Sequence, residues 1–428
     1  MLCYAHKFII RLDISSFNMQ ITGLDIGTHT IKAIVAEVGG AGPARVLKIL
    51  SAPSRGVRRG VVCDIDEMVS ASSDIFSVLR KQFRAASRNI FVGVNGPQIS
   101  SRISKGIIAV SRADNEIYRD DIERVVKASQ AVSISPNRRI IHTLTREFVV
   151  DGVSDIADPM GLVGNRLEVE SVVIDAFSPY LQSLQKVVDV SGCKLGGVVM
   201  SSVASARSVI SKKQKELGVL LIDIGAGTTG IAMFEEGKLL HAAVAPIGAT
   251  HITNDIAVGF KVPPHSAEEV KLEFGYALSR HVTPKDAIMA RQAGGVETKI
   301  SKRYLSEIIE ARLAELFDFV NNEVKSVGRV GALPAGAVLV GGGAKLPGVA
   351  EFAKEALKLS CQIGAPEPQF EIVDSDYRAE LDDPAFACVA GLVLCGKEIA
   401  GKERSFDISN WGGRAISFTT SFFKNLLP

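Results

Sequence analysis

Two copies of one short pattern lie about two hundred residues apart, and this repetition constrains the fold more than any other feature. Residues 221–230 read LIDIGAGTTG and residues 21–32 read ITGLDIGTHTIK. In each copy, apolar residues suited to a buried strand precede an aspartate, and small residues suited to a turn follow it. The repetition predicts two similar half-molecules that face each other across a cleft.

The turn after each aspartate offers the groups that a phosphate needs. Gly225 and Gly227 let the backbone approach a ligand, and their N–H groups can donate together with the hydroxyls of Thr228 and Thr229. Asp223 is expected at the exposed end of its strand, where it could hold magnesium directly or through water. An ordinary glycine-rich turn explains one copy equally well. Two copies favour a pair of phosphate hairpins.

A third glycine segment follows an apolar strand late in the chain. Residues 337–349 read AVLVGGGAKLPGV, and a helical pattern, AEFAKEALKL, comes directly after them. A single run of three glycines is weak evidence by itself. Its position after the two hairpins favours a third part of the same ligand site.

Length, charge and cysteine usage exclude several classes of protein. A chain of 428 residues is too long for one simple core, so two or more domains are expected. With 49 basic and 47 acidic residues, nothing indicates a nucleic-acid binder that works by phosphate neutralisation. The six cysteines are scattered without a CxxC pair, which favours reduced thiols in a cytoplasm over disulfides or zinc. The apolar stretch 385–395 is too short to cross a bilayer and predicts a buried helix.

The remaining pattern predicts two halves with an insertion. Residues 1–18 lack the apolar core and cleavage site of a signal peptide, and they are expected to be a disordered extension, or to precede the true start at Met19. Helices are predicted over 64–83 and 179–192. Between them, residues 86–168 combine short β-like runs with one helix, YRDDIERVVKASQAV, and are predicted to form a separate small α/β domain.

Four segments in order resemble the actin-like ATPases: ITGLDIGTHTIK, VASARSVISKKQKELGVLLIDIGAGTTGIA, PIGATHITNDIAVGF and LVGGGAKLPGV. The segment RRIIHTLTREFVVDGVSDIADPMGLVGNRLEVE is similar to the inserted subdomain of the FtsA family of bacterial cell-division proteins. The resemblance runs from about residue 21 to the end of the sequence. It implies an α/β, actin-like two-lobed fold of duplicated ribonuclease H-like domains, with an inserted small α/β subdomain and a C-terminal amphipathic helix.

The resemblance also implies a division of the chain. The expected parts are subdomain IA over 19–85, 169–197 and 380–396, the inserted subdomain IC over 86–168, subdomain IIA over 198–231 and 304–379, subdomain IIB over 232–303, a linker over 397–413 and a membrane-binding helix over 414–428.

By the same resemblance, ATP with Mg²⁺ is expected in the cleft. Asp25 and Asp223 match positions that face the magnesium and its waters, while Thr28 and Lys32 match positions that reach the β- and γ-phosphates. Opposed hairpins of this kind neutralise a triphosphate with backbone donors, a lysine and a metal ion. A solvated strand residue is the alternative for Lys32.

The ribose and adenosine are expected at the other two segments. Glu268 and Lys271 share one helical face and match the Glu-x-x-Lys pair that holds the ribose, with a plain surface ion pair as the alternative. The expected nucleotide-binding residues are Gly27, Thr28, His29, Thr30, Lys32, Gly225, Ala226, Gly227, Thr228, Thr229, Glu268, Lys271, Gly341, Gly342, Gly343 and Lys345.

Two departures from the family pattern concern catalysis. Relatives commonly have glycine or aspartate where Ala226 stands and aspartate where Gly230 stands, but small residues should preserve binding. Relatives also carry glutamine or glutamate followed by proline where Ser201 and Ser202 stand, and that side chain could orient the attacking water. Because neither serine is a good base, no catalytic residue is assigned and ATP hydrolysis is expected to be slow at most.

The C-terminal segment is expected to bind a membrane surface. A polar, glycine-ending linker leads to RAISFTTSFFKNLLP, which segregates on a helical wheel into an apolar and a polar half. Docking on the protein's own core is the alternative. The expected membrane-contacting residues are Ile416, Phe418, Phe422, Phe423, Leu426 and Leu427, with the basic Arg414 and Lys424.

The resemblance implies a peripheral protein at the division site, on the cytoplasmic face of the membrane, that forms filaments and tethers the tubulin-like protein FtsZ. The FtsZ C-terminal tail is expected to contact subdomain IIB, where Lys299, Lys302 and Arg303 could receive its acidic residues. Downstream division proteins are expected to bind the inserted subdomain. A pilus-assembly adaptor resembling PilM and a small-molecule kinase are the alternatives.

Overall fold

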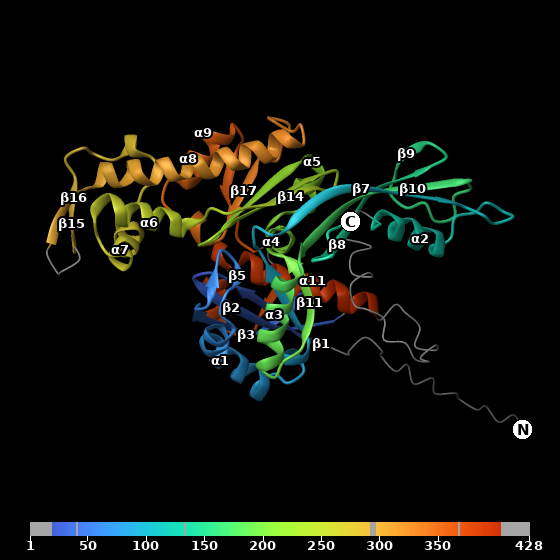
Figure 1. Cartoon of the computed structure of the whole chain (residues 1–428), viewed down its shortest axis with the longest axis horizontal. Helices are drawn as coiled ribbons and strands as arrows, with labels where there is room; N and C mark the ends of the chain where they lie inside the picture. The colour runs from blue at the N-terminus through green and yellow to red at the C-terminus, as the bar shows by residue number, and fades with distance from the viewer. Residues whose placement is uncertain (1–18, 40–41, 132–133, 292–296, 367–368, 404–428) are drawn as a thin grey trace, which may run out of the picture.

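The computed structural model describes residues 19–39, 42–131, 134–291, 297–366 and 369–403. The expectations for the extension 1–18 and for the membrane-binding residues of 414–428 lie outside these residues. Figure 1 shows two lobes one above the other, with a further subdomain extending to the side around α2 and β9.

The first lobe is built on a six-stranded sheet with the strand order β11-β6-β1-β2-β3-β19. Its strands are β1 (Met19–Ile26), β2 (Thr30–Val38), β3 (Ala44–Pro53), β6 (Ile90–Val94), β11 (Leu195–Met200) and β19 (Phe370–Ile372). The helices α1 (Ile65–Gln82), α3 (Ser178–Val190), α4 (Ser201–Val209) and α11 (Ala387–Glu403) belong to this lobe or border it, together with η2 (Ala86–Arg88) and the small hairpin β4 (Val57–Arg58) and β5 (Val61–Val62). Helix α1 starts where the sequence places it, because the Asp64 carboxylate accepts the N–H of Glu67.

The second lobe repeats this plan on a five-stranded sheet with the order β14-β13-β12-β17-β18. Its strands are β12 (Val219–Ile224), β13 (Thr229–Glu235), β14 (Lys238–Ala245), β17 (Ala337–Val340) and β18 (Cys361–Ile363). Its helices are α5 (Lys212–Leu217), α6 (Ala249–Phe260), α7 (Pro264–Phe274), α8 (Lys302–Ser326) and α9 (Val349–Leu357), and β15 (Ala287–Arg291) pairs with β16 (Glu297–Ser301) beside them.

In each lobe the Asp-Ile-Gly motif ends the first strand of an antiparallel hairpin. Asp25 pairs with Lys32 across β1 and β2, and Asp223 pairs with Gly230 across β12 and β13. Strand β12 is covered on both faces, since Leu221 belongs to the core shared with the first lobe and Leu220 to the core under α8. The predicted duplication is therefore confirmed at the level of strand pairing.

The insertion is a four-stranded sheet with the order β7-β10-β8-β9, made of β7 (Ser100–Ala109), β8 (Arg138–Val150), β9 (Val153–Ile156) and β10 (Arg166–Phe177), and packed against α2 (Arg119–Ser129). It has an apolar core of its own. The predicted start at residue 86 is wrong, because β6 pairs with β1 and β11 in the sheet of the first lobe. The predicted end at 168 is also too early, because β10 continues to Phe177.

Three further boundaries differ from the sequence prediction. The boundary expected between subdomains IA and IIA at residue 197 falls inside β11, which continues to Met200. β14 lies in the sheet of subdomain IIA although it was assigned to IIB, and β19 pairs with β3 of the first lobe although it was assigned to IIA. Helix α11 continues to Glu403, so the helix includes the first part of the predicted linker. The sequence of a short apolar strand does not indicate which sheet the strand joins. The sheet is determined by hydrogen-bond pairing with strands elsewhere in the chain.

None of the described helices is long and apolar enough to span a membrane. The described cysteines, Cys63, Cys193, Cys361, Cys388 and Cys395, are free thiols.

Candidate functional site

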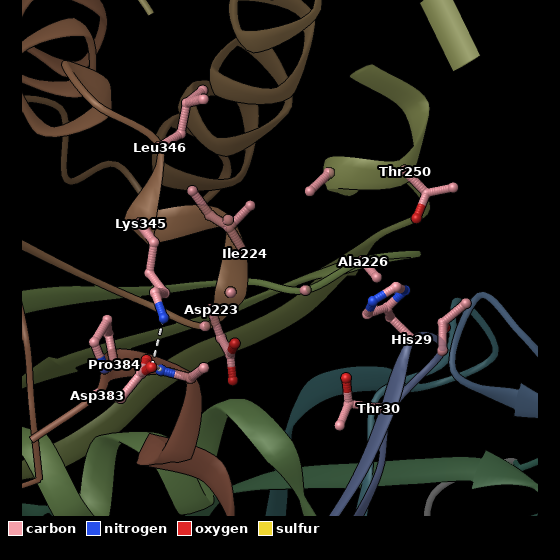
Figure 2. Close-up of a pocket in the computed structure, with 18 of the residues that line it drawn as sticks. His29, Thr30, Asp223, Ile224, Ala226, Thr250, Lys345, Leu346, Asp383 and Pro384 are labelled. Carbon is pink, nitrogen blue, oxygen red and sulfur yellow. Dashed lines mark hydrogen bonds and ion pairs between the residues drawn. The ribbon is translucent and has the colours of Figure 1, made fainter. Parts of the chain in front are cut away.

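A pocket of about 480 Å³ lies between the two lobes, within the size range of small-molecule sites. Both hairpins, the glycine segment after β17, the helix α7 and the residues before α11 contribute to its wall. Figure 2 shows Lys345 and Asp383 on one side of the pocket and His29, Ala226 and Thr250 on the other, with Asp223 between them. Of the expected ligand residues, the pocket brings together Asp25, Gly27, Thr28, His29, Thr30, Lys32, Asp223, Gly225, Ala226, Glu268, Lys271, Gly341, Gly342, Gly343 and Lys345.

The first hairpin supplies a tight turn and a lysine. A Cβ at Gly27 would lie 2.6 Å from the Thr30 carbonyl oxygen, so the turn requires a residue without a side chain. The Thr28 hydroxyl accepts the N–H of Gly60 at 3.0 Å, which ties the turn to the β4–β5 hairpin. Lys32 lies with its Nζ 5.4 Å from the centre of the Phe386 ring and lines the pocket, so it is not a solvated strand residue.

The second hairpin differs from the sequence expectation. Asp223 was expected at an exposed strand end, but only 7% of it is exposed, because α4 covers the strand and Ser205 Oγ donates to Asp223 Oδ2 at 2.7 Å. Gly225 and Ala226 line the pocket.

Three predicted donors of the second hairpin do not reach the pocket. The Thr228 hydroxyl donates to the Asn95 carbonyl at 3.1 Å, and the Thr229 hydroxyl donates to the Ile247 carbonyl at 2.8 Å. A Cβ at Gly227 would lie 2.8 Å from Thr28 Oγ1, so this glycine allows the two hairpins to approach each other. The three residues do not line the pocket, and the prediction that the two threonine hydroxyls face a phosphate is wrong, because both hydroxyls are hydrogen-bonded to neighbouring backbone carbonyls.

The two aspartates form the electrostatic centre of the site. Burial raises the pKa of Asp25, partly offset by Lys32. Burial also raises the pKa of Asp223 to about 6, with the Ser205 hydrogen bond acting against it and Asp25 adding to it. One buried and one half-buried carboxylate near one lysine leave excess negative charge, which a divalent cation would offset.

The residues present fit magnesium better than a metal held by protein alone. Among the residues that the structure describes, no three His, Cys, Asp or Glu side chains gather around one point. Magnesium characteristically takes one or two carboxylates and completes its shell with water and substrate phosphates. Asp25 and Asp223 would supply the protein oxygens.

Glu268 and Lys271 form a partly buried pair on α7 and line the pocket. Lys271 Nζ donates to Glu268 Oε2 at 2.7 Å and to Thr253 Oγ1 at 2.9 Å, and its side chain is 8% exposed. Burial raises the pKa of Glu268, but the hydrogen bonds from Lys271 and Thr253 outweigh it and leave the pKa below its usual value. The pair is therefore not a plain surface ion pair, and it presents fixed polar groups to the pocket.

The glycine segment lets the backbone approach the second hairpin. Gly341 has φ +84°, and a Cβ there would lie 2.5 Å from Asp223 Oδ1. Lys345, in the short helix η4 (Gly342–Lys345), donates to Asp383 Oδ2 at 2.6 Å (Figure 2). Since Asp383 precedes α11, this ion pair connects the second lobe to the first.

The apolar part of the wall is not apparent from sequence motifs. Its residues are Ile252, Leu272, Leu313, Leu346, Pro347 and Phe386, to which Thr250 and Asp383 add polar groups. These residues come from separate elements and share no spacing. The helical periodicity of apolar residues on α6, α7 and α8 predicts which positions are buried, but it does not distinguish positions that face a cavity from positions in the core.

The remaining sequence candidates lie away from the pocket. Ser201 and Ser202 are buried at the start of α4, where Ser202 Oγ donates to the Ile231 carbonyl at 3.2 Å. Lys302 lies over the Phe274 ring at 5.2 Å, and Arg303 pairs with Glu307 at 3.4 Å, so both cations already have neighbours. Lys299 is exposed on β16.

Comparison with known proteins decides the family. The family model for cell division protein FtsA matches residues 220–391, and the model for the SHS2 domain inserted in FtsA matches residues 96–175. The cell division protein FtsA of Pseudomonas aeruginosa is 35% identical over 391 residues, which cover 91% of this chain and 92% of that protein. The chain belongs to the FtsA family of cell-division proteins. The FtsA of Bacillus subtilis is 34% identical and covers 87% of this chain and 84% of its own length.

Solved structures show that this FtsA-family chain has the actin-like fold. The PilM-PilN type IV pilus biogenesis complex matches with a TM-score of 0.64 at 19% identity, over 88% of this chain and 98% of the other. MreB5 of Spiroplasma citri bound to ADP matches with a TM-score of 0.54 at 14% identity, over 91% and 99%. At these identities the likeness concerns the fold. Membership of the FtsA family decides against the pilus adaptor and the kinase as the family of this chain.

Proposed function

We propose that this actin-like cell-division protein binds ATP with Mg²⁺ between its lobes, assembles into filaments on the inner face of the membrane and anchors FtsZ there. The observation that carries the nucleotide proposal is the convergence of both Asp-Ile-Gly hairpins, the Glu268–Lys271 pair and the glycine segment on one pocket. Two hairpins from opposite lobes can enclose the phosphates, and the apolar wall can take the base.

Slow turnover is part of the proposal. Ser201 and Ser202 are buried and do not line the pocket, and a serine hydroxyl is a poor base for an attacking water molecule. A nucleotide that is hydrolysed slowly would hold the two lobes in one arrangement for a long time. A stable arrangement of the lobes suits a filament subunit.

Nucleotide binding is tested by titrating the full chain with a fluorescent ATP analogue, with and without Mg²⁺. Lys271→Met should weaken binding roughly 10-fold or more, because it removes a buried charge and leaves Glu268 unpaired. Lys261→Met is the matched control, since Lys261 is an exposed lysine on the same lobe that does not line the pocket. Equal affinity for the two variants would contradict the proposed site.

Membrane attachment rests on the amphipathic pattern of 414–428, and FtsZ anchoring rests on the family. The test compares the full chain with a chain that ends at residue 413, in co-pelleting with anionic vesicles and in binding to the FtsZ C-terminal peptide. The truncated chain should stay in the supernatant and still bind the peptide. Pelleting of both chains to the same extent would contradict the membrane proposal, and failure of both to bind the peptide would contradict the FtsZ proposal.

A further inference from the structure

A second cavity, of about 470 Å³, lies in the first lobe, and half of the residues that line it are basic. Its wall consists of Arg80, Arg84, Ser87, Arg88, Asp189, Gly192, Cys193 and Lys194. These residues come from the end of α1, the turn through η2, the last turn of α3 and the turn that follows it. Figure 1 shows α1 and α3 together in the lower lobe.

Four cations face one carboxylate around this cavity. Within the described part of the chain, Arg80, Arg84, Arg88 and Lys194 form no ion pair within 4.0 Å. Arginines near a helix end can interact with its last carbonyls, and Arg80 lies in the last turn of α1. Arg84, Arg88 and Lys194 lie beyond that helix, so this role does not account for them.

The cavity is shaped by a specific turn rather than by flexible side chains alone. Gly192 has φ +71°, and a Cβ there would lie 3.2 Å from Arg80 Cδ, so the Arg80 side chain lies across this turn. Cys193 is buried beside it, at 4% exposure. The arrangement leaves a concave site of positive charge, which fits a compact multivalent anion such as a phosphate group.

The position of this site connects it with the C-terminal segment. Helix α11 starts against the end of β6, where Cys388 Sγ lies 3.1 Å from the Cβ position of Gly93. It then passes the beginnings of the strands, because the Cβ position of Gly396 lies 2.7 Å from Phe91 and 2.8 Å from Ile21. The cavity residues 87–88 and 192–194 precede β6 and β11, so the cavity and the later part of α11 both lie toward the beginnings of these parallel strands.

We propose that this cavity, the Arg84 site, binds the phosphate of an anionic lipid headgroup when the C-terminal segment engages the membrane. The inference rests on the proposed membrane function. A cationic site at the same end of the strands as the later part of α11 would add electrostatic attraction to the apolar contacts of residues 414–428. It would also fix which face of the first lobe meets the lipid, because a single tether cannot orient a protein.

The test uses the full chain and three sets of substitutions. The first, Arg84→Gln with Arg88→Gln and Lys194→Gln, removes three charges from the Arg84 site. The matched control, Lys212→Gln with Lys213→Gln and Lys325→Gln, removes three exposed charges from the second lobe. The conservative set, Arg84→Lys with Arg88→Lys and Lys194→Arg, keeps the charge.

Binding is measured on phosphatidylglycerol and on phosphatidylcholine vesicles. Each basic residue near an anionic surface contributes about 1 kcal/mol, or roughly fivefold in affinity. The first set should therefore bind phosphatidylglycerol vesicles at least about 10-fold more weakly than the matched control, with no difference on phosphatidylcholine. The conservative set should bind like the unchanged protein, which also shows that the substitutions do not act through misfolding.

Equal binding of the first set and the matched control would overturn the inference and leave the proposed membrane function intact, provided that deletion of 414–428 abolishes binding. If the deletion has no effect, the proposed function itself fails. Inorganic phosphate separates the two sources of the anion. An increase of Tm by phosphate in the unchanged protein and not in the first set, with equal vesicle binding, would assign the site to free phosphate and overturn the lipid assignment.

Discussion

At the scale of single residues, the buried carboxylate of Asp223 lowers the free energy of unfolding by an amount that depends on pH. The pKa of Asp223 is raised from 3.8 to about 6 in the folded protein, mainly by burial. A folded pKa above the unfolded one means that the protonated form is favoured by folding. The contribution of Asp223 to the stability of the nucleotide-free protein is therefore most favourable below the unfolded pKa and is lost as the pH rises through about 6.

Asp223→Asn should remove this cost. The amide oxygen can still accept the Ser205 hydroxyl, while no charge is buried at neutral pH. We expect the free energy of unfolding of the nucleotide-free variant at pH 8 to exceed that of the unchanged protein by roughly 2–3 kcal/mol, with little difference at pH 4. Urea denaturation at both pH values measures this. Equal stability at pH 8 would contradict the buried-charge account, and nucleotide affinity should fall in the same variant.

His142 produces the opposite pH dependence. It is buried between the insertion and the first lobe, where its Nε2 accepts the Met200 N–H at 2.9 Å, and burial lowers its pKa to about 3. Because the folded pKa lies below the unfolded one, the contribution of His142 to stability is lost as the pH falls below 6.5.

His142→Gln keeps an acceptor for Met200 and cannot be protonated. Between pH 7 and about 4.5, the variant should lose roughly 2–3 kcal/mol less stability than the unchanged protein. Chemical denaturation over this range provides the measurement, with His265→Gln, on an exposed residue, as the control. A parallel loss in all three proteins would show that His142 does not set the acid sensitivity.

At the scale of elements, hydrogen bonds join the second hairpin to the first lobe at Asn95, which directly follows β6. The Asn95 Nδ2 donates to Thr228 Oγ1 at 3.1 Å, and the Asn95 carbonyl accepts the Thr228 hydroxyl. The second hairpin is thus joined to the residues from which the insertion departs. A rearrangement of that hairpin would therefore displace the residues at the start of the insertion.

Gly341→Ala should disrupt the close approach of the glycine segment to β12. The new Cβ would lie 2.5 Å from Asp223 Oδ1 at a left-handed backbone position, so we expect a loss of about 1–3 kcal/mol in stability and weaker nucleotide binding. Gly342→Ala is the control for stability, since a Cβ there has no neighbour within 4 Å. Thermal melting of both variants measures the difference, and equal melting temperatures would be evidence against this geometry.

At the scale of the whole molecule, the pocket belongs to neither lobe alone. One carboxylate comes from β1 and the other from β12, and the Lys345–Asp383 ion pair spans the cleft (Figure 2). A ligand held from both sides should restrict the motion of both hairpins together.

Hydrogen exchange can test this. Addition of ATP with Mg²⁺ should slow exchange at residues 24–32 and at 221–229 to a similar degree, because each hairpin contacts the same phosphates. Helix α2 and strand β9, at the far end of the insertion (Figure 1), should exchange at unchanged rates and serve as an internal control. Protection of one hairpin alone would place the nucleotide on a single lobe and contradict the enclosed site.

The sequence by itself determined the duplicated hairpins, and its resemblance to the actin-like ATPases indicated about half of the residues that line the pocket. The hairpins could be predicted because a buried strand that ends in Asp-Ile-Gly needs a particular backbone, and that requirement is local. Only the tertiary structure decided that Asp223 is buried, that Thr228 and Thr229 close the hairpin instead of facing a ligand, and that β6 and β19 join the first lobe. These features depend on pairing and packing between segments far apart in the chain, for which a single sequence carries no local signal.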